Sequence, residues 1–189
     1  DALAAYRKAV EIQEPLASAR PDQAGWQNEL CASQLKEGRI LQSQGDLVGA
    51  LDTFRKSLAA GRRLVVASPA NATGQRNLSI CLDRVGEVLL AQNDLAGAVL
   101  ACRESLAITQ QLAATDPLNA GAQRDLYEAH RNVARVLEKQ GDPQARDHWM
   151  HAYTNLAGLK TRGLHLSPEL LSIFEQLRQT VETNASSIR

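Results

Sequence analysis

Residues 94–141 read DLAGAVLACRESLAITQQLAATDPLNAGAQRDLYEAHRNVARVLEKQG, and the chain repeats this stretch. Residues 46–93 read DLVGALDTFRKSLAAGRRLVVASPANATGQRNLSICLDRVGEVLLAQN, which aligns with it without a gap and is identical at 19 positions. Agreement of this extent is not coincidence, so an array of structural repeats is the first hypothesis for the fold.

The rest of the chain continues the repeat in both directions. The first residues, DALAAYRKAV, match residues 49–58, so residue 1 falls inside a repeat and we expect the chain to be a fragment of a larger protein. We interpret residues 1–189 as a single domain. A partial first repeat and one further helix occupy residues 1–45, and two full repeats follow at residues 46–93 and 94–141. A last repeat helix occupies residues 142–166, and a capping helix occupies residues 167–189.

Apolar side chains recur at helical spacing along the whole chain, which predicts an all-α fold of about eight helices. The expected helices cover residues 1–20, 22–44, 46–67, 72–92, 94–115, 119–140, 142–162 and a last segment from residue 168. Short connections between them predict antiparallel helix pairs, and small residues such as Gly49 and Ala50 should let two helices approach closely.

Turn chemistry predicts where these helices begin and end. Glycine or asparagine suits the left-handed residue after a helix, and an aspartate or asparagine that follows caps the next helix. The expected junctions are Gly45-Asp46, Asn93-Asp94 and Gly141-Asp142, and further N-caps are Asn71 and Asn119.

The fourth repeat departs from the pattern. Pro143 takes a first-turn position that tolerates proline, and Arg146, Trp149, Met150 and Tyr153 replace smaller residues, so packing should change there. The run Ser167-Pro168-Glu169 predicts the start of a last helix, which Gly163 separates from the one before. Its expected apolar face, which would cover the open end of the array, is Leu170, Leu171, Phe174, Leu177 and Val181.

The amino-acid composition excludes some classes of function. The formal net charge is zero and the isoelectric point is near 7.1, which argues against binding to nucleic acid or a membrane surface through bulk charge. Three cysteines without CxxC spacing indicate reduced thiols in a cytoplasmic protein. Buried thiols are the favoured interpretation, and a contact between Cys81 and Cys102 across the Asn93 turn is the alternative.

The repeat positions Gly38, Leu41, Ala50, Phe54 and Ser57 resemble the tetratricopeptide repeat, with Gly86, Leu89, Ala98, Cys102 and Ser105 as their counterparts. The unit is longer than the 34 residues usual in that family and is similar to the long-helix variety found in large bacterial signalling proteins. The resemblance implies a right-handed superhelical solenoid whose concave groove, lined by the first helix of each pair, binds proteins or peptides.

The first-helix positions expected to face this groove differ between repeats, whereas the packing positions recur. The groove candidates are Asn28, Leu35, Arg39 and Gln42 in the first full helix pair, Arg76, Asp83 and Glu87 in the second, and Arg124, Glu128, Arg131, Arg135 and Glu138 in the third. Their spacing of three and four places each set on one helical face.

Arg124, Arg131 and Arg135 would form a basic stripe on one of these faces. Arginine binds carboxylates bidentately, so one hypothesis is an acidic peptide segment or a chain-terminal carboxylate held there. The alternative is a solvated surface on which these arginines pair with Glu128, Glu138 and Asp125. The glutamines that precede Asn28, Arg76 and Arg124 recur between repeats, which favours a structural role for them.

A zinc site is the remaining candidate for chemistry. His148 and His151 lie one turn apart, and His130 falls at a similar height across the Gly141 turn, although partly buried histidines without a metal are the favoured interpretation. No phosphate loop, nucleophile elbow or paired-acid motif is present.

We therefore expect a protein- or peptide-binding scaffold that is not an enzyme and needs no cofactor, metal, nucleic acid or membrane. The alternative is a structural array that oligomerises or packs on other domains of its parent signalling protein.

Overall fold

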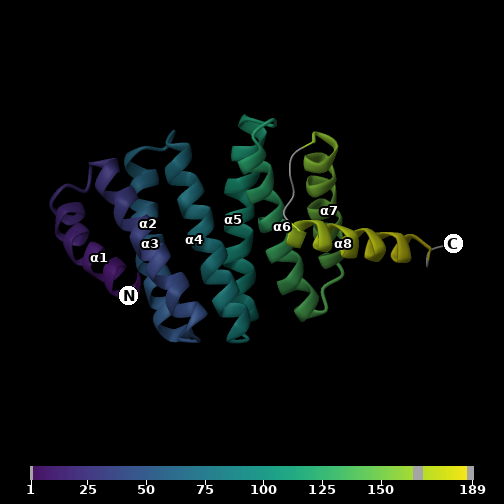
Figure 1. Cartoon of the computed structure of the whole chain (residues 1–189), viewed down its shortest axis with the longest axis horizontal. Coiled ribbons are helices and arrows are strands. Elements are labelled where there is room, and N and C mark those ends of the chain that lie inside the picture. The colour runs from purple at the N-terminus through teal and green to yellow at the C-terminus, as the bar shows by residue number, and fades with distance from the viewer. Residues whose placement is uncertain (1, 164–167, 187–189) are drawn as a thin grey trace. The chain divides into compact units, whose positions relative to one another are not determined.

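A computed structural model describes residues 2–163 and 168–186, with the side chains of residue 169 and residues 180–186 excepted. The described secondary structure is entirely helical (Figure 1). The helices are α1 (Ala2–Ala19), α2 (Ala24–Ser43), α3 (Leu47–Ala67), α4 (Ala72–Ala91), α5 (Leu95–Thr115), α6 (Ala120–Gln140), α7 (Ala145–Thr161) and α8 (Pro168–Ser186). This confirms the predicted all-α fold, and no described helix is long and apolar enough to cross a membrane.

Contacts divide the chain into two compact units, residues 1–108 and residues 109–189. In the N-terminal unit α1 packs on α2, α2 on α3 and α3 on α4, and α2 also contacts α4. In the C-terminal unit α6 packs on α7 and α7 packs on α8. Helices joined by short turns lie antiparallel, as predicted for helix pairs. The superhelical arrangement and the interpretation of the chain as a single domain remain predictions.

Caps and left-handed residues fix the ends of the helices as the turn chemistry predicts, with one exception. The N-cap of α7 is Gln144, whose side chain forms no capping bond, because Asp142 lies in the turn before it and accepts from the N–H of Gln144 at 2.9 Å. Gly45, Asn93 and Gly141 have φ angles of 84°, 64° and 71°. The capping side chains accept hydrogen bonds from backbone N–H groups: Asp46 from Gly49 at 2.8 Å, Asp94 from Gly97 at 2.9 Å, Asn71 from Gly74 at 3.0 Å and Asn119 from Ala122 at 3.1 Å.

The expectation that Gly49 lets two helices approach closely is wrong. A methyl group added there would meet the carboxylate of Asp46, so the small residue serves the cap rather than the approach of two helices. Its counterpart Gly97 stands in the same relation to Asp94.

The close approach of paired helices depends instead on a glycine opposite a larger side chain. A Cβ at Gly38 in α2 would lie 2.5 Å from the ring of Phe54 in α3, and a Cβ at Gly86 in α4 would lie 2.5 Å from the sulfur of Cys102 in α5. Both partners are buried, so each glycine leaves the space into which the facing side chain fits.

A buried hydrogen bond also recurs between paired helices. The hydroxyl of Ser57 donates to the carbonyl of Cys31 at 2.8 Å, and the hydroxyl of Ser105 donates to the carbonyl of Ser79 at 3.0 Å. Each donor and each acceptor is 48 residues from its counterpart, so the helix pairs of the N-terminal unit repeat in their contacts as well as in sequence.

Helix α7 confirms that packing changes in the fourth repeat. It begins at Ala145, three residues later than expected, because Pro143 lies in the preceding turn rather than in the helix. Its buried residues are Ala145, Ala152, Leu156 and Leu159, whereas Met150, at the position of Phe54, is 37% exposed. The helix is therefore turned about its axis, which leaves its larger side chains off the line of buried positions.

Helix α8 runs across the direction of α7 and packs on it (Figure 1). Phe174 and Leu177 join a core with Tyr127 and Leu156, and the rings of Tyr153 and Phe174 stack with centroids 5.1 Å apart. The apolar face of α8 differs from the expected one. Leu171 is exposed and Ile173 packs in its place, and the contributions of Ser167, Glu169 and Val181 lie outside the described residues.

The glycine contact between α2 and α3 can be tested by adding one methyl group. Gly38→Ala should lower the free energy of unfolding by about 1–3 kcal/mol, because the ring of Phe54 must shift, although alanine is the better helix former. Urea denaturation followed by circular dichroism measures this. Gly25→Ala in the same helix is the control, since a Cβ there meets nothing within 4 Å. Equal stability of the two variants would contradict the packing argument.

Candidate functional site

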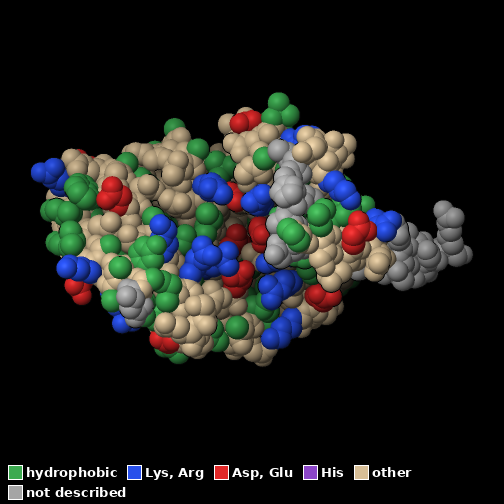
Figure 2. All heavy atoms as spheres, viewed as in Figure 1, with side chains coloured by type: hydrophobic (Ala, Val, Ile, Leu, Met, Phe, Trp, Pro, Cys, Tyr) green, Lys and Arg blue, Asp and Glu red, His purple; other side chains and the backbone are tan. Residues whose placement is uncertain are grey.

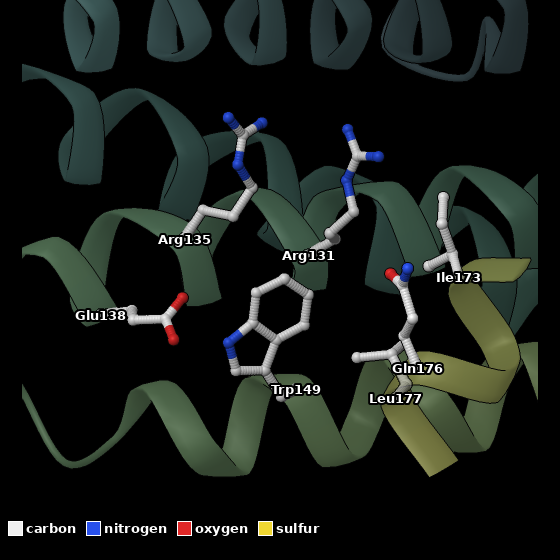
Figure 3. A pocket seen from close by; sticks show the side chains of 7 residues that line it. All are labelled: Arg131, Arg135, Glu138, Trp149, Ile173, Gln176 and Leu177. Atoms are coloured by element: carbon white, nitrogen blue, oxygen red, sulfur yellow. The ribbon is translucent and has the colours of Figure 1, made fainter. Parts of the chain in front are cut away.

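The basic face of α6 borders a cavity in the C-terminal unit. The cavity has a volume of about 350 Å³ and lies among α6, α7 and α8 (Figure 3). Its lining residues are Arg131, Arg135, Glu138, Trp149, Ile173, Gln176 and Leu177. Three of the predicted groove residues are therefore brought together here, because positions 131, 135 and 138 follow one another at helical spacing on α6.

The two arginines of the cavity differ in their partners. Arg131 is partly buried and its guanidinium lies 3.3 Å from the carboxylate of Glu128, one turn earlier on α6. Arg135 is exposed and forms no ion pair with a described residue. Both side chains extend in the same direction from α6 (Figure 3). The prediction of a solvated, paired surface thus holds for Arg131, whereas Arg135 keeps its bidentate donors available.

The cavity has an apolar wall opposite this charged edge. Trp149 of α7 is half-buried and packs against the core of the C-terminal unit, and Leu177 of α8 is buried. Ile173 and Gln176 of α8 complete the wall, with the amide of Gln176 on the side of Arg131 (Figure 3). An indole face, aliphatic groups and an arginine together suit a segment that carries an acidic group beside an apolar side chain.

Sequence reasoning found the polar edge of the cavity but not its apolar wall. Neither Trp149 nor any residue of α8 was among the groove candidates. Their place depends on how α8 lies across α7, which is a tertiary contact without a local signal in the sequence. The other two candidates on α6, Arg124 and Glu128, lie outside the cavity, and Arg124 is exposed without an ion pair to a described residue.

The candidates of the N-terminal unit are placed differently. The amide oxygen of Asn28 accepts from Asn77 at 2.6 Å, which joins α2 to α4. Leu35 packs against a buried cluster around Cys31, and Asp83 is only 8% exposed. These three side chains therefore contribute to packing between helices.

The remaining candidates of this unit lie at the surface. Glu87 forms an ion pair with Arg84 at 2.6 Å, Arg76 is exposed, and Gln42 is half-buried. Arg39 lines a cavity of about 420 Å³ together with Tyr6, Lys36, Ile40 and Ser43, where the ammonium of Lys36 lies 5.5 Å from the centre of the Tyr6 ring. This second cavity is also basic, and its apolar lining consists of Tyr6 and Ile40.

The recurrent glutamines have structural contacts, as favoured from the sequence. Gln27 is buried, donates to the carbonyl of Ala17 at 2.7 Å and accepts from Arg63 at 3.2 Å. Gln75 donates to the carbonyl of Pro69 at 2.7 Å. Both side chains satisfy backbone carbonyls near the end of a preceding helix.

Surface charge is mixed rather than of one sign. Figure 2 shows Lys and Arg side chains interspersed with Asp and Glu side chains on the face in view. Recognition on such a surface depends on individual positions such as Arg135 rather than on a general field.

The three histidines gather as their spacing predicts. The Nδ1 atoms of His130 and His148 are 3.1 Å apart, and the rings of His130 and His151 stack with centroids 4.9 Å apart. Among the described residues no group of three histidine, cysteine or acidic side chains is arranged to hold a metal ion. Burial, together with the neighbouring imidazoles of His151 and His148, lowers the pKa of His130 to about 4.

Comparison with known proteins gives similarity to solved structures alone. No protein family matches the sequence, and no curated protein matches it. Among solved structures, the chain is similar to a de novo designed helical repeat protein, with a TM-score of 0.38, 19% identity, and coverage of 100% of this chain and 96% of that one.

The histidine cluster predicts that acid destabilises the C-terminal unit. The pKa of His130 is about 4 when folded and near 6.5 when unfolded, so the unfolded chain binds one more proton between these values. The free energy of unfolding should fall as the pH drops from 6.5 towards 4, by at most about 1.4 kcal/mol per pH unit from this group. Denaturation of the wild type and of His130→Gln across this range measures the difference. Parallel pH profiles for the two proteins would refute the assignment.

Proposed function

We propose that the chain is a protein-interaction module of the tetratricopeptide type that holds an acidic peptide segment in the cavity among α6, α7 and α8. One observation carries the proposal: Arg135, which has no ion pair among the described residues, borders a cavity whose opposite wall is Trp149 and Leu177. A partner with a carboxylate beside an apolar side chain would pair with Arg135 and pack against Trp149 and Leu177 at the same time.

The chemistry of this recognition is charge and shape complementarity. Arg135 contributes a planar, permanently charged group that can bind a carboxylate through two parallel hydrogen bonds. Arg131 contributes a second positive group, partly offset by Glu128 at 3.3 Å. Trp149 is anchored in the core by its packing, so the apolar wall is already formed before a ligand binds and little ordering is needed.

Binding without chemistry is the function that the helical architecture supports. The surface candidates of the N-terminal unit, among them Arg39, Gln42 and Arg76, would give that unit a contact surface of its own. The resemblance to long-helix repeats further supports a place in a large bacterial signalling protein of the cytoplasm. The acidic segment would then belong to another protein or to another domain of the same parent chain.

A second function is favoured by apolar side chains that the described structure leaves exposed. Val48, Val66 and Leu100 of the N-terminal unit are between 71% and 81% exposed. An array that packs on a neighbouring domain or on a second copy would cover such side chains. Light scattering tests the second copy directly: a monomer over the accessible concentration range excludes self-association and leaves a partner domain as the occupant.

Selection from a random-peptide display library tests the binding proposal. Enriched peptides should contain an acidic residue next to an apolar one. In fluorescence anisotropy with a synthetic copy, Arg135→Glu should weaken binding about tenfold or more, because a charge-assisted hydrogen bond is replaced by repulsion. Binding should also weaken as the salt concentration rises.

Arg146→Glu is the matched control for this experiment. Arg146 is an exposed arginine on α7 that does not line the cavity, so its reversal makes the same change in net charge. Equal affinity of the wild type and the Arg135→Glu variant, or equal losses in both variants, would reject the cavity as the binding site.

A further inference from the structure

Two cysteines from different repeats meet in the core of the N-terminal unit. The sulfur atoms of Cys31 in α2 and Cys81 in α4 are 3.7 Å apart, and both residues are fully buried. The hydroxyl of Ser57 in α3 lies 2.9 Å from the sulfur of Cys81 and 3.3 Å from that of Cys31. The partner of Cys81 is therefore Cys31, whereas Cys102 lies against Gly86. This replaces the alternative of a Cys81–Cys102 contact.

The geometry of this pair is close to that of a disulfide. A disulfide has an S–S distance of about 2.05 Å, so the two sulfur atoms must approach each other by about 1.6 Å. Helices α2 and α4 already pack directly on each other, and Asn28 and Asn77 join them by a hydrogen bond of 2.6 Å. The two helices that carry the sulfur atoms are therefore already held next to each other.

We propose that Cys31 and Cys81 form an oxidisable dithiol, which a peroxide converts to an intramolecular disulfide that joins α2 to α4. This site is independent of the peptide-binding cavity, which lies in the other compact unit.

The reaction proceeds in two balanced steps. The thiolate of Cys31 attacks one oxygen of hydrogen peroxide, the O–O bond breaks, and the departing hydroxide takes up the proton lost by the thiol to give water and a sulfenic acid. Cys81 then attacks the sulfur of the sulfenic acid, the S–O bond breaks, and the second water leaves with the proton of Cys81. Two thiols and one peroxide thus give one disulfide and two waters, with both electrons supplied by the cysteines.

The surroundings assign different roles to the two thiols. A hydrogen bond with Cys81 lowers the pKa of Cys31 to about 7, against the effect of burial and with help from Ser57. The pKa of Cys81 is raised by that same hydrogen bond and by burial. These directions favour Cys31 as the attacking thiolate and Cys81 as the thiol that closes the disulfide.

Burial controls the rate and the selectivity of the reaction. Because neither sulfur is exposed, oxidation requires transient opening of the helix packing, which favours an oxidant as small as peroxide over bulky disulfide reagents. Once Cys31 is oxidised, Cys81 is in place to react before a second peroxide can arrive. The disulfide holds α2 and α4, the first helices of two neighbouring pairs, at a fixed distance.

Peroxide treatment of the intact chain tests the proposal. After oxidation, unfolding in denaturant and maleimide labelling, mass spectrometry should find one labelled cysteine instead of three, with a linked peptide that contains Cys31 and Cys81. The oxidised protein should melt ~5 °C or more above the reduced protein, and a thiol reductant should reverse the shift.

Variants of each cysteine provide the controls. Cys102→Ala should still form the linked peptide, whereas Cys31→Ala and Cys81→Ala should not, with native folding confirmed by circular dichroism. Linkage mapping in the wild type does not depend on the folding of any variant. The proposal is overturned if all three cysteines remain labelled, if the linked peptide contains Cys102 or joins two chains, or if Cys31 is oxidised beyond the sulfenic acid without a disulfide.

Discussion

The contact of Gly38 with the ring of Phe54 represents the constraint on which the helix pairs depend. Two long helices can bury their apolar faces only if their backbones approach, and a glycine opposite a large side chain provides the room. Gly86 and Cys102 repeat the arrangement with a smaller partner. Around these contacts the serine hydroxyls of the second helices bond to carbonyls of the first helices, so the register of each pair is fixed by shape and by hydrogen bonding together.

The cavity in the C-terminal unit follows from the loss of this pattern. Phe54 in α3 and its counterpart Cys102 in α5 are buried, whereas Met150, at the same repeat position in α7, is exposed. Helix α7 buries Ala152 and Leu156 in the core instead. Trp149 then lies only half-buried, and α8 packs beside it rather than over it. The half-buried indole of Trp149 thus lines the cavity next to Arg131 and Arg135.

Polar groups inside the two units set their sensitivity to conditions. Cys31, Ser57 and Cys81 place two thiols and a hydroxyl where three helices meet, and this cluster links adjacent repeats. In the other unit, His130 is held neutral by burial and by two neighbouring imidazoles. Each cluster forms from residues that are distant in sequence, so its properties belong to the packed core and disappear on unfolding.

The sequence by itself determined the helices, their ends and their pairing. Internal repetition, glycine and asparagine at left-handed positions and the aspartate and asparagine caps are local signals, and the described boundaries lie within three residues of those expected. Tertiary structure alone decided that Cys31 is a neighbour of Cys81, that Asp83 is buried and Leu35 packs against a buried cluster, and that α8 supplies a wall of the cavity. The reason is physical: caps and turns depend on residues a few positions apart, whereas these contacts depend on how whole helices rotate and cross, which the spacing of apolar residues constrains only to within one helical face.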